Sequence, residues 1–377
     1  MTMSSVPPLK PEVLRKLSGR SLLTTEDFDQ DELEALVGVA ARFAALDRAG
    51  KRTPLLPHEL AYALFFDNST RTKSAWAGAA ARLGMQPVIV DGSSTQVEHG
   101  ETAAETGAML GMNAHALGVR HDLILGEGNR FMQQVKKGID DYLAATTNSR
   151  SVPIVNLQCD VDHPTQTLAD LCWLKEFFPE GIAGKRIAVS WAYSPSYAKP
   201  LSVPQGLIML LPRFGAHVTL AHPEGYRLLE NTLDAAKRGA DRGGGTFRVT
   251  HSMDEAFSGA HVVYPKSWGP HELMLERVAA NRRGDKPAMG EIEKRCLAQN
   301  AQHRDWICDE RRMERTEGGK ALYMHCLPAD IGAEVSPGIM ARHSVHVARE
   351  ANWKVYVIMA LLSVAKVPEL AARLESL

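Results

Sequence analysis

The sequence predicts an α/β protein made of two doubly wound, parallel-sheet domains. Three observations lead to this fold class. The chain has 377 residues, which is more than one compact core usually holds. Short apolar stretches with the length of buried strands alternate with stretches of helical periodicity. The alternation forms two series, and the polar stretch "TTNSRSVP" near residue 150 separates them.

The first series covers residues 28–122. Residues 28–48 have apolar side chains at helical spacing and predict an amphipathic helix. Strands and helices then alternate in the β–α–β–α–β order of a parallel sheet covered on both faces. The helix after the first strand is expected to end at Gly84, because glycine is favoured just beyond a helix C-terminus. The expected strands are 59–66, 86–92 and 114–122, and the expected helices are 73–84 and 100–111.

The second series repeats this alternation from residue 153 onward. It ends in a further amphipathic helix, "EANWKVYVIMALLSVAK", at residues 350–366. No internal repeat interrupts the pattern. The expected strands of this series are 153–159, 185–192, 216–223, 246–252, 261–268 and 321–328, and the other helices are 164–178, 203–215 and 226–245.

Composition excludes several classes of protein. The chain has 43 basic and 44 acidic residues, so no basic excess favours a nucleic-acid partner. The five cysteines are scattered and show no C-x-x-C spacing, which favours reduced thiols and no metal site. Residues 1–16 lack the apolar core of a signal peptide, and no apolar run is long enough to cross a membrane. We therefore expect a cytoplasmic protein without a membrane partner, a metal or a cofactor.

The stretch "FFDNSTRTK" joins the first expected strand to the next helix. It brings Ser69, Thr70, Arg71, Thr72 and Lys73 to a helix N-terminus, where free N–H groups and the helix dipole favour an anion. Hydroxyls and a guanidinium add donors that suit a phosphate. Ser and Thr are also ordinary helix caps. These five residues alone leave a phosphate site and a plain cap equally open.

Further polar groups follow other expected strands. His163 and Gln166 lie where a strand leads into a helix, and His325 and Cys326 lie at the end of another strand. Open α/β sheets bind their ligands at the carboxyl ends of their strands. These side chains are therefore candidates for one shared site.

Together these motifs resemble the aspartate/ornithine carbamoyltransferase family. The S-T-R-T-R carbamoyl-phosphate loop of the family appears as residues 69–73, with Lys73 in the last position. The H-P-x-Q motif appears as residues 163–166, and the H-C-L-P motif as residues 325–328. Arg120 lies on the strand where the family has a second arginine for carbamoyl phosphate. Three motifs in the right order are much more specific than any one of them.

Residues 191–207 and 262–270 resemble the knotted subgroup, which includes the N-acetylornithine and N-succinylornithine enzymes, and are most similar to its YgeW-type branch. The resemblance implies the fold of aspartate and ornithine carbamoyltransferases, with a trefoil knot in the second domain as an exception to the rule against knots. It also implies a carbamoyl-phosphate domain over residues 1–150, completed by the C-terminal helix 350–377. An acceptor domain would then cover residues 151–349.

The resemblance implies transfer of a carbamoyl group between carbamoyl phosphate and the nitrogen of a small carboxylate-bearing amine or ureido compound. The catabolic, phosphorolytic direction stays open, because one site catalyses both directions. The leaving phosphate can accept the proton of the amine, so no protein base is required. By resemblance, the catalytic residues are Arg71, Thr72, Arg120, His163, Gln166 and Cys326. Carbamoyl phosphate would contact Ser69, Thr70, Arg71, Thr72, Arg120, His163, Gln166 and the backbone near Leu327.

The acceptor side is also assigned by resemblance. Lys266 would hold the acceptor's carboxylate, although an exposed lysine at a strand end is the plainer interpretation. The loop of residues 91–101 would reach into a neighbouring subunit, with Gln96 and His99 as candidates, in a homotrimer with shared active sites. The acceptor-binding residues expected from one chain are Lys266, Ser267, Trp268, His325, Cys326 and Lys354, joined by Gln96 of the neighbouring subunit.

Departures from the family pattern keep alternatives open. Lys73 and Lys354 stand where arginines are usual, and no aspartate-containing S-M-G loop is found, which counts against plain ornithine specificity. The alternatives are an ornithine or N-acylornithine carbamoyltransferase and a non-catalytic binding protein that keeps the fold. A dinucleotide-dependent oxidoreductase is disfavoured because no G-x-G-x-x-G joins a strand to a helix.

Overall fold

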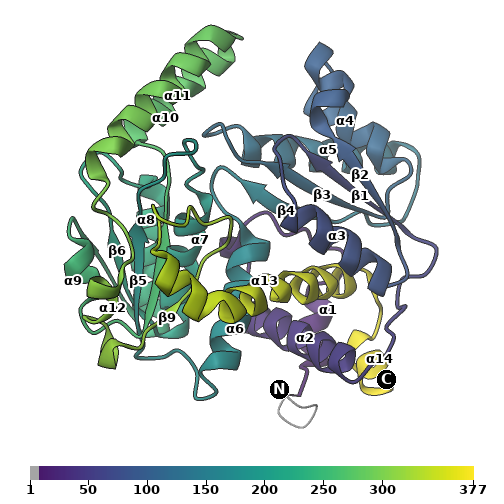
Figure 1. The fold of residues 1–377 in the computed structure, drawn as a ribbon. Coiled ribbons are helices and arrows are strands. Elements are labelled where there is room, and N and C mark those ends of the chain that lie inside the picture. The colour runs from purple at the N-terminus through teal and green to yellow at the C-terminus, as the bar shows by residue number, and fades with distance from the viewer. Residues whose placement is uncertain (1–7) are drawn as a thin grey trace.

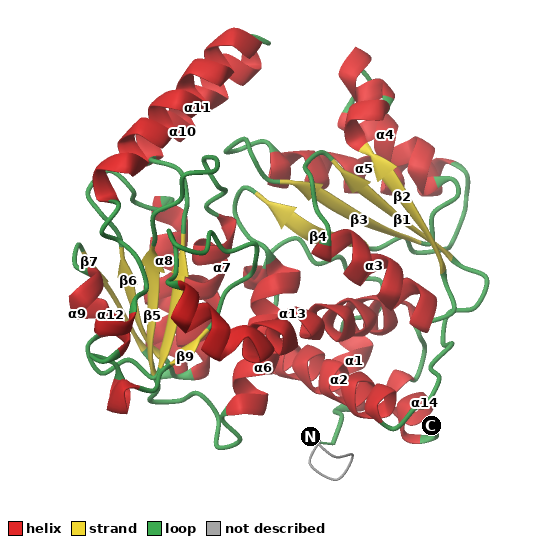
Figure 2. Ribbon diagram, viewed as in Figure 1, coloured by secondary structure: helices red, strands yellow, loops and turns green. Residues whose placement is uncertain are grey.

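The computed structural model describes residues 8–377 and contains two parallel sheets (Figure 1). The first sheet has the strand order β2–β1–β3–β4, and the second has the order β7–β6–β5–β8–β9. Helices cover both faces of each sheet (Figure 2), so the predicted two-domain parallel α/β fold is confirmed. Residues 1–7, part of the expected first domain and N-terminal segment, lie outside the described residues. The strands are β1 (Leu60–Phe65), β2 (Gln86–Asp91), β3 (Ala116–His121), β4 (Ile154–Cys159), β5 (Arg186–Trp191), β6 (His217–Ala221), β7 (Thr246–Thr250), β8 (Val262–Lys266) and β9 (Leu322–Tyr323).

One strand belongs to a different sheet from the one predicted. The sequence analysis placed 153–159 in the second series, and this was wrong, because β4 pairs in parallel with β3 in the first sheet. The cause is α5 (Gly128–Ala145), a helix that the analysis did not identify. Parallel neighbouring strands need a crossover of a dozen or more residues, usually a helix, and α5 is that crossover. The chain therefore changes sheets between β4 and β5.

A long C-terminal helix joins the two halves of the molecule. This helix, α13 (Pro337–Lys366), begins thirteen residues before the predicted residue 350, with Ser336 Oγ accepting a hydrogen bond from the Ile339 N–H at its start. Its C-terminal half is almost entirely buried. It packs against α2 (Gln30–Arg48), α3 and α6 of the first half and against β9 of the second (Figure 1). Any residue on its buried face can therefore reach the boundary between the two sheets.

The predicted helices fall close to the observed ranges, but four short helices, Pro11–Lys16, Met253–Phe257, Glu310–Met313 and Leu370–Glu375, and one longer pair were not predicted. Two helices, α10 and α11, project from the second domain as an arm that the sequence analysis did not predict (Figure 2). Among residues 8–377, no helix is both long and apolar enough to cross a membrane. The remaining α-helices are α1 (Pro11–Lys16), α3 (Arg71–Arg82), α4 (Ala103–Gly111), α6 (Pro164–Phe177), α7 (Ser202–Leu210), α8 (Glu230–Gly243), α9 (Met253–Phe257), α10 (His271–Arg282), α11 (Lys286–Asn300), α12 (Glu310–Met313) and α14 (Leu370–Glu375).

The helices α4 and α5 pack with their backbones in close contact. A Cβ atom added at Gly138 would lie 2.0 Å from the Ala104 carbonyl oxygen, and one at Gly107 would lie 2.2 Å from the Val135 carbonyl oxygen. Neither position can hold a side chain unless the two helices separate. Glycine at these positions fixes the distance between α4 and α5.

We expect Gly138→Ala to lower the free energy of unfolding by roughly 1–3 kcal/mol, because the added methyl group must push the two helices apart. Urea unfolding followed by circular dichroism measures the change. The matched control is Gly290→Ala in α11, where an added Cβ meets nothing within 4 Å. That variant should be neutral or more stable by up to about 1 kcal/mol, since alanine is the better helix former. Equal stability of the two variants would contradict the packing described here.

Candidate active site

The largest described cavity, about 800 Å³, lies where the carboxyl ends of the two sheets face each other. Its wall comes from both halves of the chain and from α13. This is the position at which open α/β sheets bind ligands. The predicted site residues that line it are Ser69, Thr70, Arg71, Thr72, Arg120, His163, Lys266, Cys326, Leu327 and Lys354. Those that do not line it are Gln166, Ser267, Trp268, His325 and Gln96.

The turn between β1 and α3 forms one end of the cavity. The Thr72 N–H donates to Ser69 Oγ at 3.2 Å, so Ser69 does help to cap the helix while its neighbours face the cavity. Lys73 also lines the cavity, with its ammonium 5.2 Å from the centre of the Phe65 ring. The free N–H groups of the first turn of α3 therefore lie beside two cationic side chains, Arg71 and Lys73. This combination suits an anion such as a phosphate.

Arg71 connects the two halves of the chain. Its Nε donates to the Cys326 carbonyl oxygen at 3.2 Å, and its Nη2 donates to the Leu327 carbonyl oxygen. Both acceptors lie in the turn after β9, in the second domain. Burial lowers the pKa of the Arg71 guanidinium, which still stays charged because its ordinary pKa is far above neutral. No described carboxylate pairs with Arg71, so its charge is available to a ligand.

A second arginine lines the cavity at the end of the neighbouring strand, β3. Arg120, at the end of β3, pairs with Asp122 at 2.9 Å, and the side chain of Asp122 is fully buried. The Asp122 N–H donates to Asp67 Oδ2 at 3.0 Å, which links the end of β3 to the turn after β1. Arg120 is therefore held in place by a buried carboxylate, whereas Arg71 is held by backbone carbonyls.

His163, Thr72 and Lys354 meet on the floor of the cavity. Lys354 Nζ lies 3.4 Å from Thr72 Oγ1 and 3.4 Å from His163 Nε2, while His163 Nδ1 lies 3.3 Å from Thr165 Oγ1. Burial, followed by the charges of Lys354, Arg120 and Arg71, lowers the pKa of His163 well below its ordinary value. The imidazole is therefore neutral at neutral pH. Lys354 touches two residues assigned to carbamoyl phosphate, whereas the sequence analysis expected it at the acceptor.

The side chain of Gln166 points into the protein, where it contacts a pair of buried acidic side chains, Asp170 and Glu350. Its Nε2 donates to Asp170 Oδ1 at 2.6 Å, and Tyr264 donates to Asp170 Oδ2 at 3.3 Å. The carboxyl of Asp170 also acts on that of Glu350 on α13. Burial raises the pKa of Asp170 to about 7 and raises the pKa of Glu350 well above its ordinary value. Burial of the two carboxyls therefore favours their protonated forms.

The turn after β9 is held in position by one member of this acid pair, Glu350. Glu350 Oε2 accepts the His325 N–H at 3.0 Å, and His325 Nδ1 accepts the Leu327 N–H at 2.8 Å. The imidazole of His325 is thus used inside the turn, while Cys326 and Leu327 face the cavity. The peptide bond between Leu327 and Pro328 is cis, and Leu327 has a φ of 54°. Sequence reasoning missed Asp170 and Glu350; for Asp170 the available signal was a carboxylate in a stretch, residues 164–174, that is otherwise uncharged.

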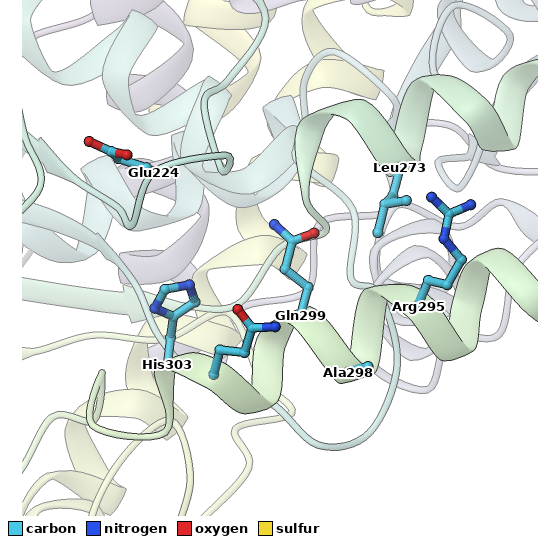
Figure 3. Close-up of a pocket in the computed structure, with 7 residues that line it drawn as sticks. Glu224, Leu273, Arg295, Ala298, Gln299 and His303 are labelled. Carbon is cyan, nitrogen blue, oxygen red and sulfur yellow. The ribbon is translucent and has the colours of Figure 1, made fainter.

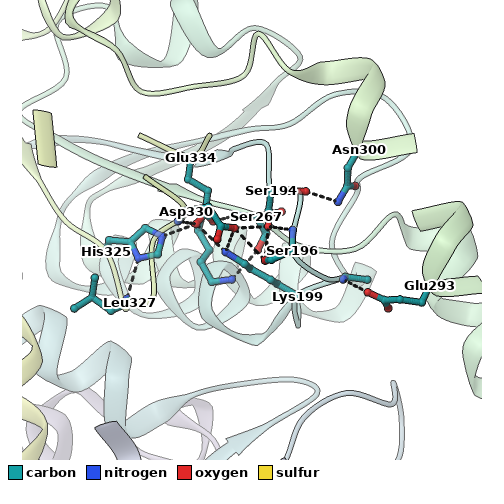
Figure 4. A network of polar contacts seen from close by, with 12 residues as sticks. Ser194, Ser196, Lys199, Ser267, Glu293, Asn300, His325, Leu327, Asp330 and Glu334 are labelled. Carbon is teal, nitrogen blue, oxygen red and sulfur yellow. Dashed lines mark hydrogen bonds and ion pairs between the residues drawn. The ribbon is translucent and has the colours of Figure 1, made fainter. Parts of the chain in front are cut away.

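A buried ion cluster supports the acceptor side (Figure 4). Lys199 donates to Glu334 at 2.7 Å and to Asp330 at 2.8 Å, and Glu334 also accepts the Ser267 N–H at 2.7 Å. His325 Nε2 lies 3.5 Å from Glu334. Burial alone would raise the pKa of Glu334, but His325, Lys199 and Lys266 hold it below its ordinary value. Lys199 lines the cavity and was not identified from the sequence.

Lys266, at the end of β8, differs from Lys199 in having no ionic partner among the described residues. Its buried ammonium donates to the Ser267 carbonyl oxygen at 2.7 Å and faces the cavity. Burial lowers its pKa. By contrast, Trp268 is core: it is fully buried and its Nε1 donates to the Tyr226 carbonyl oxygen at 2.8 Å. A buried, unpaired lysine facing a cavity is a natural partner for a ligand carboxylate.

Gln96 and His99 lie away from this cavity. They are exposed in a short 3₁₀ helix, Gln96–His99, after β2, although Asp91 and Ser93 at the base of the same loop do line the cavity. Among residues 8–377, no group of three or more histidines, cysteines or acidic side chains is arranged to hold a metal ion.

A smaller hollow of about 410 Å³ lies at the base of the α11 arm, between Glu224, Gln299 and His303 (Figure 3). Its Arg295 is paired in bidentate fashion with Glu276 at 2.5 and 3.0 Å. None of the predicted site residues lines this hollow. The cavity between the sheets is therefore the candidate active site.

Two family models match the chain. Residues 20–176 match the model described as "Aspartate/ornithine carbamoyltransferase, carbamoyl-P binding domain". Residues 201–365 match the model described as "Aspartate/ornithine carbamoyltransferase, Asp/Orn binding domain". The first matched region contains the turn between β1 and α3, and the second contains Lys266 and the turn after β9.

Known relatives cover nearly the whole chain. "Putative carbamoyltransferase YgeW" of Escherichia coli strain K12 is 46% identical over 369 residues, covering 96% of this chain and 93% of that protein. "N-acetylornithine carbamoyltransferase" of Xanthomonas campestris pv. campestris is 28% identical, covering 92% and 98%. A solved structure of mutant N-acetyl-L-ornithine transcarbamylase, complexed with carbamyl phosphate and N-succinyl-L-norvaline, matches with a TM-score of 0.74 and 25% identity, covering 91% and 99%.

We expect Glu334→Gln to lower the free energy of unfolding by about 3 kcal/mol, because it leaves the buried ammonium of Lys199 with only one carboxylate. A carboxylate with a lowered pKa stabilises the fold above the pKa of the unfolded chain and loses that effect as pH falls. The variant should therefore lose less stability than the wild type on acidification below about pH 4. Urea unfolding over a pH series measures both effects.

The control for this prediction is Glu314→Gln, an exposed glutamate at the end of α12. It should change stability by less than about 0.5 kcal/mol at every pH. Equal effects of the two substitutions would show that the Lys199 cluster adds nothing to stability.

Proposed function

The chain belongs to the aspartate/ornithine carbamoyltransferase family and is a carbamoyltransferase, and from that premise we propose that its acceptor is a small molecule with one carboxylate. The observation that carries this proposal is the distribution of charge in the cavity. Cations line both ends of the cavity: Arg71, Arg120 and Lys354 at the donor end, and Lys266 at the acceptor end. Family membership removes the support for an oxidoreductase or a non-catalytic scaffold.

Carbamoyl phosphate fits the donor end. The phosphate would contact the first turn of α3 and the side chains of Ser69, Thr70 and Arg71. The carbamoyl oxygen, which gains charge as the amine attacks, would accept hydrogen bonds from Thr72 and Arg120, with the neutral His163 beside them. Such preorganised donors stabilise the developing oxyanion. Gln166, now bonded to Asp170, would have to turn toward the cavity to reach the carbamoyl nitrogen.

The chemistry consists of one displacement at the carbamoyl carbon. The acceptor nitrogen forms a bond to this carbon, the bond to the bridging phosphate oxygen breaks, and the leaving phosphate takes the proton released by the nitrogen. Positioning and electrostatics supply the acceleration, so neither a covalent intermediate nor a nucleophilic Cys326 is needed. In reverse, phosphate attacks a ureido compound, and the same residues serve the catabolic direction.

The acceptor end supports a carboxylate without a neighbouring ammonium. Lys266 is unpaired, while Lys199 is already neutralised by Asp330 and Glu334. None of the described residues that line the cavity from the second domain is acidic. A free α-ammonium group would therefore find carboxylate partners only across the cavity, where Asp67, Asp91 and Asp122 line the first domain. This favours an acylated amino acid or a ureido acid over ornithine itself.

We also propose that the protein is a homotrimer whose loop 91–101 contributes Gln96 to a neighbouring site. The segment from β2 to α4 supports an interface, because Ile89, Met109 and Met112 are 39%, 49% and 38% exposed despite their apolar side chains.

The five free cysteines support a reducing, cytoplasmic location. A trefoil knot in the second domain is part of the same proposal; there the loop after β5 contacts a distant segment, since the Tyr193 N–H donates to the Trp306 carbonyl oxygen at 2.8 Å.

We expect phosphate release from carbamoyl phosphate to respond to one member of an acceptor panel that contains N-acetylornithine, ornithine and aspartate, while ureido acids are tested in the reverse direction by the consumption of phosphate. Arg71→Ala should weaken donor binding by roughly 10–100-fold, because it removes a charged hydrogen-bond donor, and should abolish this release. Arg52→Ala, at an exposed arginine, is the control and should behave as the wild type. Donor binding that is unchanged in Arg71→Ala would exclude this cavity as the donor site.

We expect Lys266→Met to raise the KM for the acceptor by roughly 10–100-fold while the Kd for carbamoyl phosphate stays unchanged, because the lysine pairs with the acceptor only. A carboxamide analogue of the acceptor makes the test specific. The wild type should prefer the carboxylate over the carboxamide, and Lys266→Met should lose that preference. A preference that survives the substitution places the carboxylate elsewhere.

A further inference from the structure

Lys354 has an unusual environment for a lysine. It lies on the buried face of α13 with only 3% of its surface exposed, and it lines the cavity. The partners of its Nζ are Thr72 Oγ1 and His163 Nε2, each at 3.4 Å, and both are neutral. No described carboxylate forms an ion pair with it. A buried ammonium without a counter-charge is costly, and a lysine can avoid this cost by releasing its proton.

The groups around Lys354 are mostly cationic. From α3 it faces Arg71, from β3 it faces Arg120, and Lys266 of β8 acts on the adjacent His163. The opposing groups are Cys326 in the turn after β9 and Asp170 on α6, and burial raises the pKa of Asp170 to about 7. Asp67, Asp91 and Asp122 also line the cavity, but none of these carboxylates forms an ion pair with Lys354.

We propose that Lys354 takes up a proton when carbamoyl phosphate binds, so that this lysine makes donor binding depend on pH. The inference rests on the proposed function, because it assumes that the donor occupies this cavity. The proton comes from solvent and joins the lone pair of the neutral Nζ. The resulting ammonium has three N–H groups: two for Thr72 Oγ1 and His163 Nε2, and one for an oxygen of the donor.

The hydrogen bonds of His163 agree with this arrangement. Thr165 Oγ1 lies 3.3 Å from His163 Nδ1 and can accept its proton, which leaves the lone pair of Nε2 directed at Lys354. His163 can therefore accept from an ammonium at position 354. Burial and the charge of Arg71 lower the pKa of Lys354 to about 7, so the exchange falls in the neutral range. An arginine could not take part in it, because its guanidinium stays charged.

The direction of the pH effect follows from linkage. Below about pH 7 the lysine is already charged in the free protein, and binding takes up no proton at this site. Above about pH 7 the free protein has lost the proton and must regain it to bind the dianion, so affinity falls with rising pH. Between about pH 7 and about pH 8.5 the Kd should rise roughly tenfold.

The test uses a phosphonate analogue of carbamoyl phosphate, in which a methylene group replaces the bridging oxygen so that it cannot react. Calorimetry at about pH 8, in two buffers with different ionisation enthalpies, gives the number of protons taken up on binding. The wild type should take up nearly one proton more than Lys354→Arg, and the Kd of Lys354→Arg should rise less between about pH 7 and about pH 8.5. Lys73→Arg is the matched control at another lysine that lines the cavity, and its proton uptake should equal that of the wild type.

Each outcome has a distinct meaning. Equal proton uptake by the wild type and Lys354→Arg, with parallel pH profiles, overturns the proposal even though the donor binds. If Lys354→Arg does not fold, the wild type alone tests the proposal. Proton uptake by the wild type that does not exceed the uptake due to the ionisation of the analogue itself also overturns the proposal. Failure of the wild type to bind the analogue at any pH would instead contradict the proposed function.

Discussion

The site depends on the two hydrogen bonds from Arg71 to the carbonyl oxygens of Cys326 and Leu327. They join the start of α3 in the first half to the turn after β9 in the second. The turn is itself held by His325, whose backbone N–H is bound to Glu350 on α13. A helix that packs against both halves thus fixes the position of a guanidinium on the opposite side of the cavity. The cavity keeps its shape only while these contacts are made together.

The buried cations of the molecule fall into two groups with different consequences. Lys199 is neutralised by Asp330 and Glu334, so its charge is satisfied without a ligand. Lys266 and Lys354 are equally buried but have neutral partners only. Leaving a charge unpaired in the interior destabilises the empty protein, and an anionic ligand removes that penalty. An anionic ligand would therefore stabilise the protein most at Lys266, whereas Lys354 can also reduce the penalty by losing its proton.

The sequence predicted most of this structure, and its errors have physical causes. Strands were found because buried parallel strands are continuous apolar runs, which local pattern reveals. The strand at 153–159 was assigned to the wrong sheet because α5, the crossover that returns it to β3, was not recognised. Pairing between strands depends on such connections, which no local pattern encodes.

The same distinction between local patterns and contacts with distant segments applies to the residues of the site. The phosphate loop and His163 were found because each is a short local motif, and they do line the cavity. Lys199 and Glu350 were missed because their roles arise from partners more than 20 residues away in the chain. His325 and Trp268 were predicted at the acceptor, yet their side chains are used by the turn and the core. A motif identifies residues that belong together, but it does not tell which of them face the ligand.

The exchange of arginine for lysine at position 354 illustrates why charge alone is an incomplete description of such a site. A guanidinium would bring a permanent charge next to Arg71 and Arg120, and the empty cavity would have to tolerate three fixed cations. A lysine in the same place can be neutral when the cavity is empty and charged when it is full, because burial and Arg71 lower its pKa to about 7. It gives up the bidentate geometry of arginine in return for a lower electrostatic cost in the empty state. Burial also raises the pKa of Asp170 to about 7 and the pKa of Glu350 above its ordinary value, so the charge of several groups near this part of the cavity can change with pH.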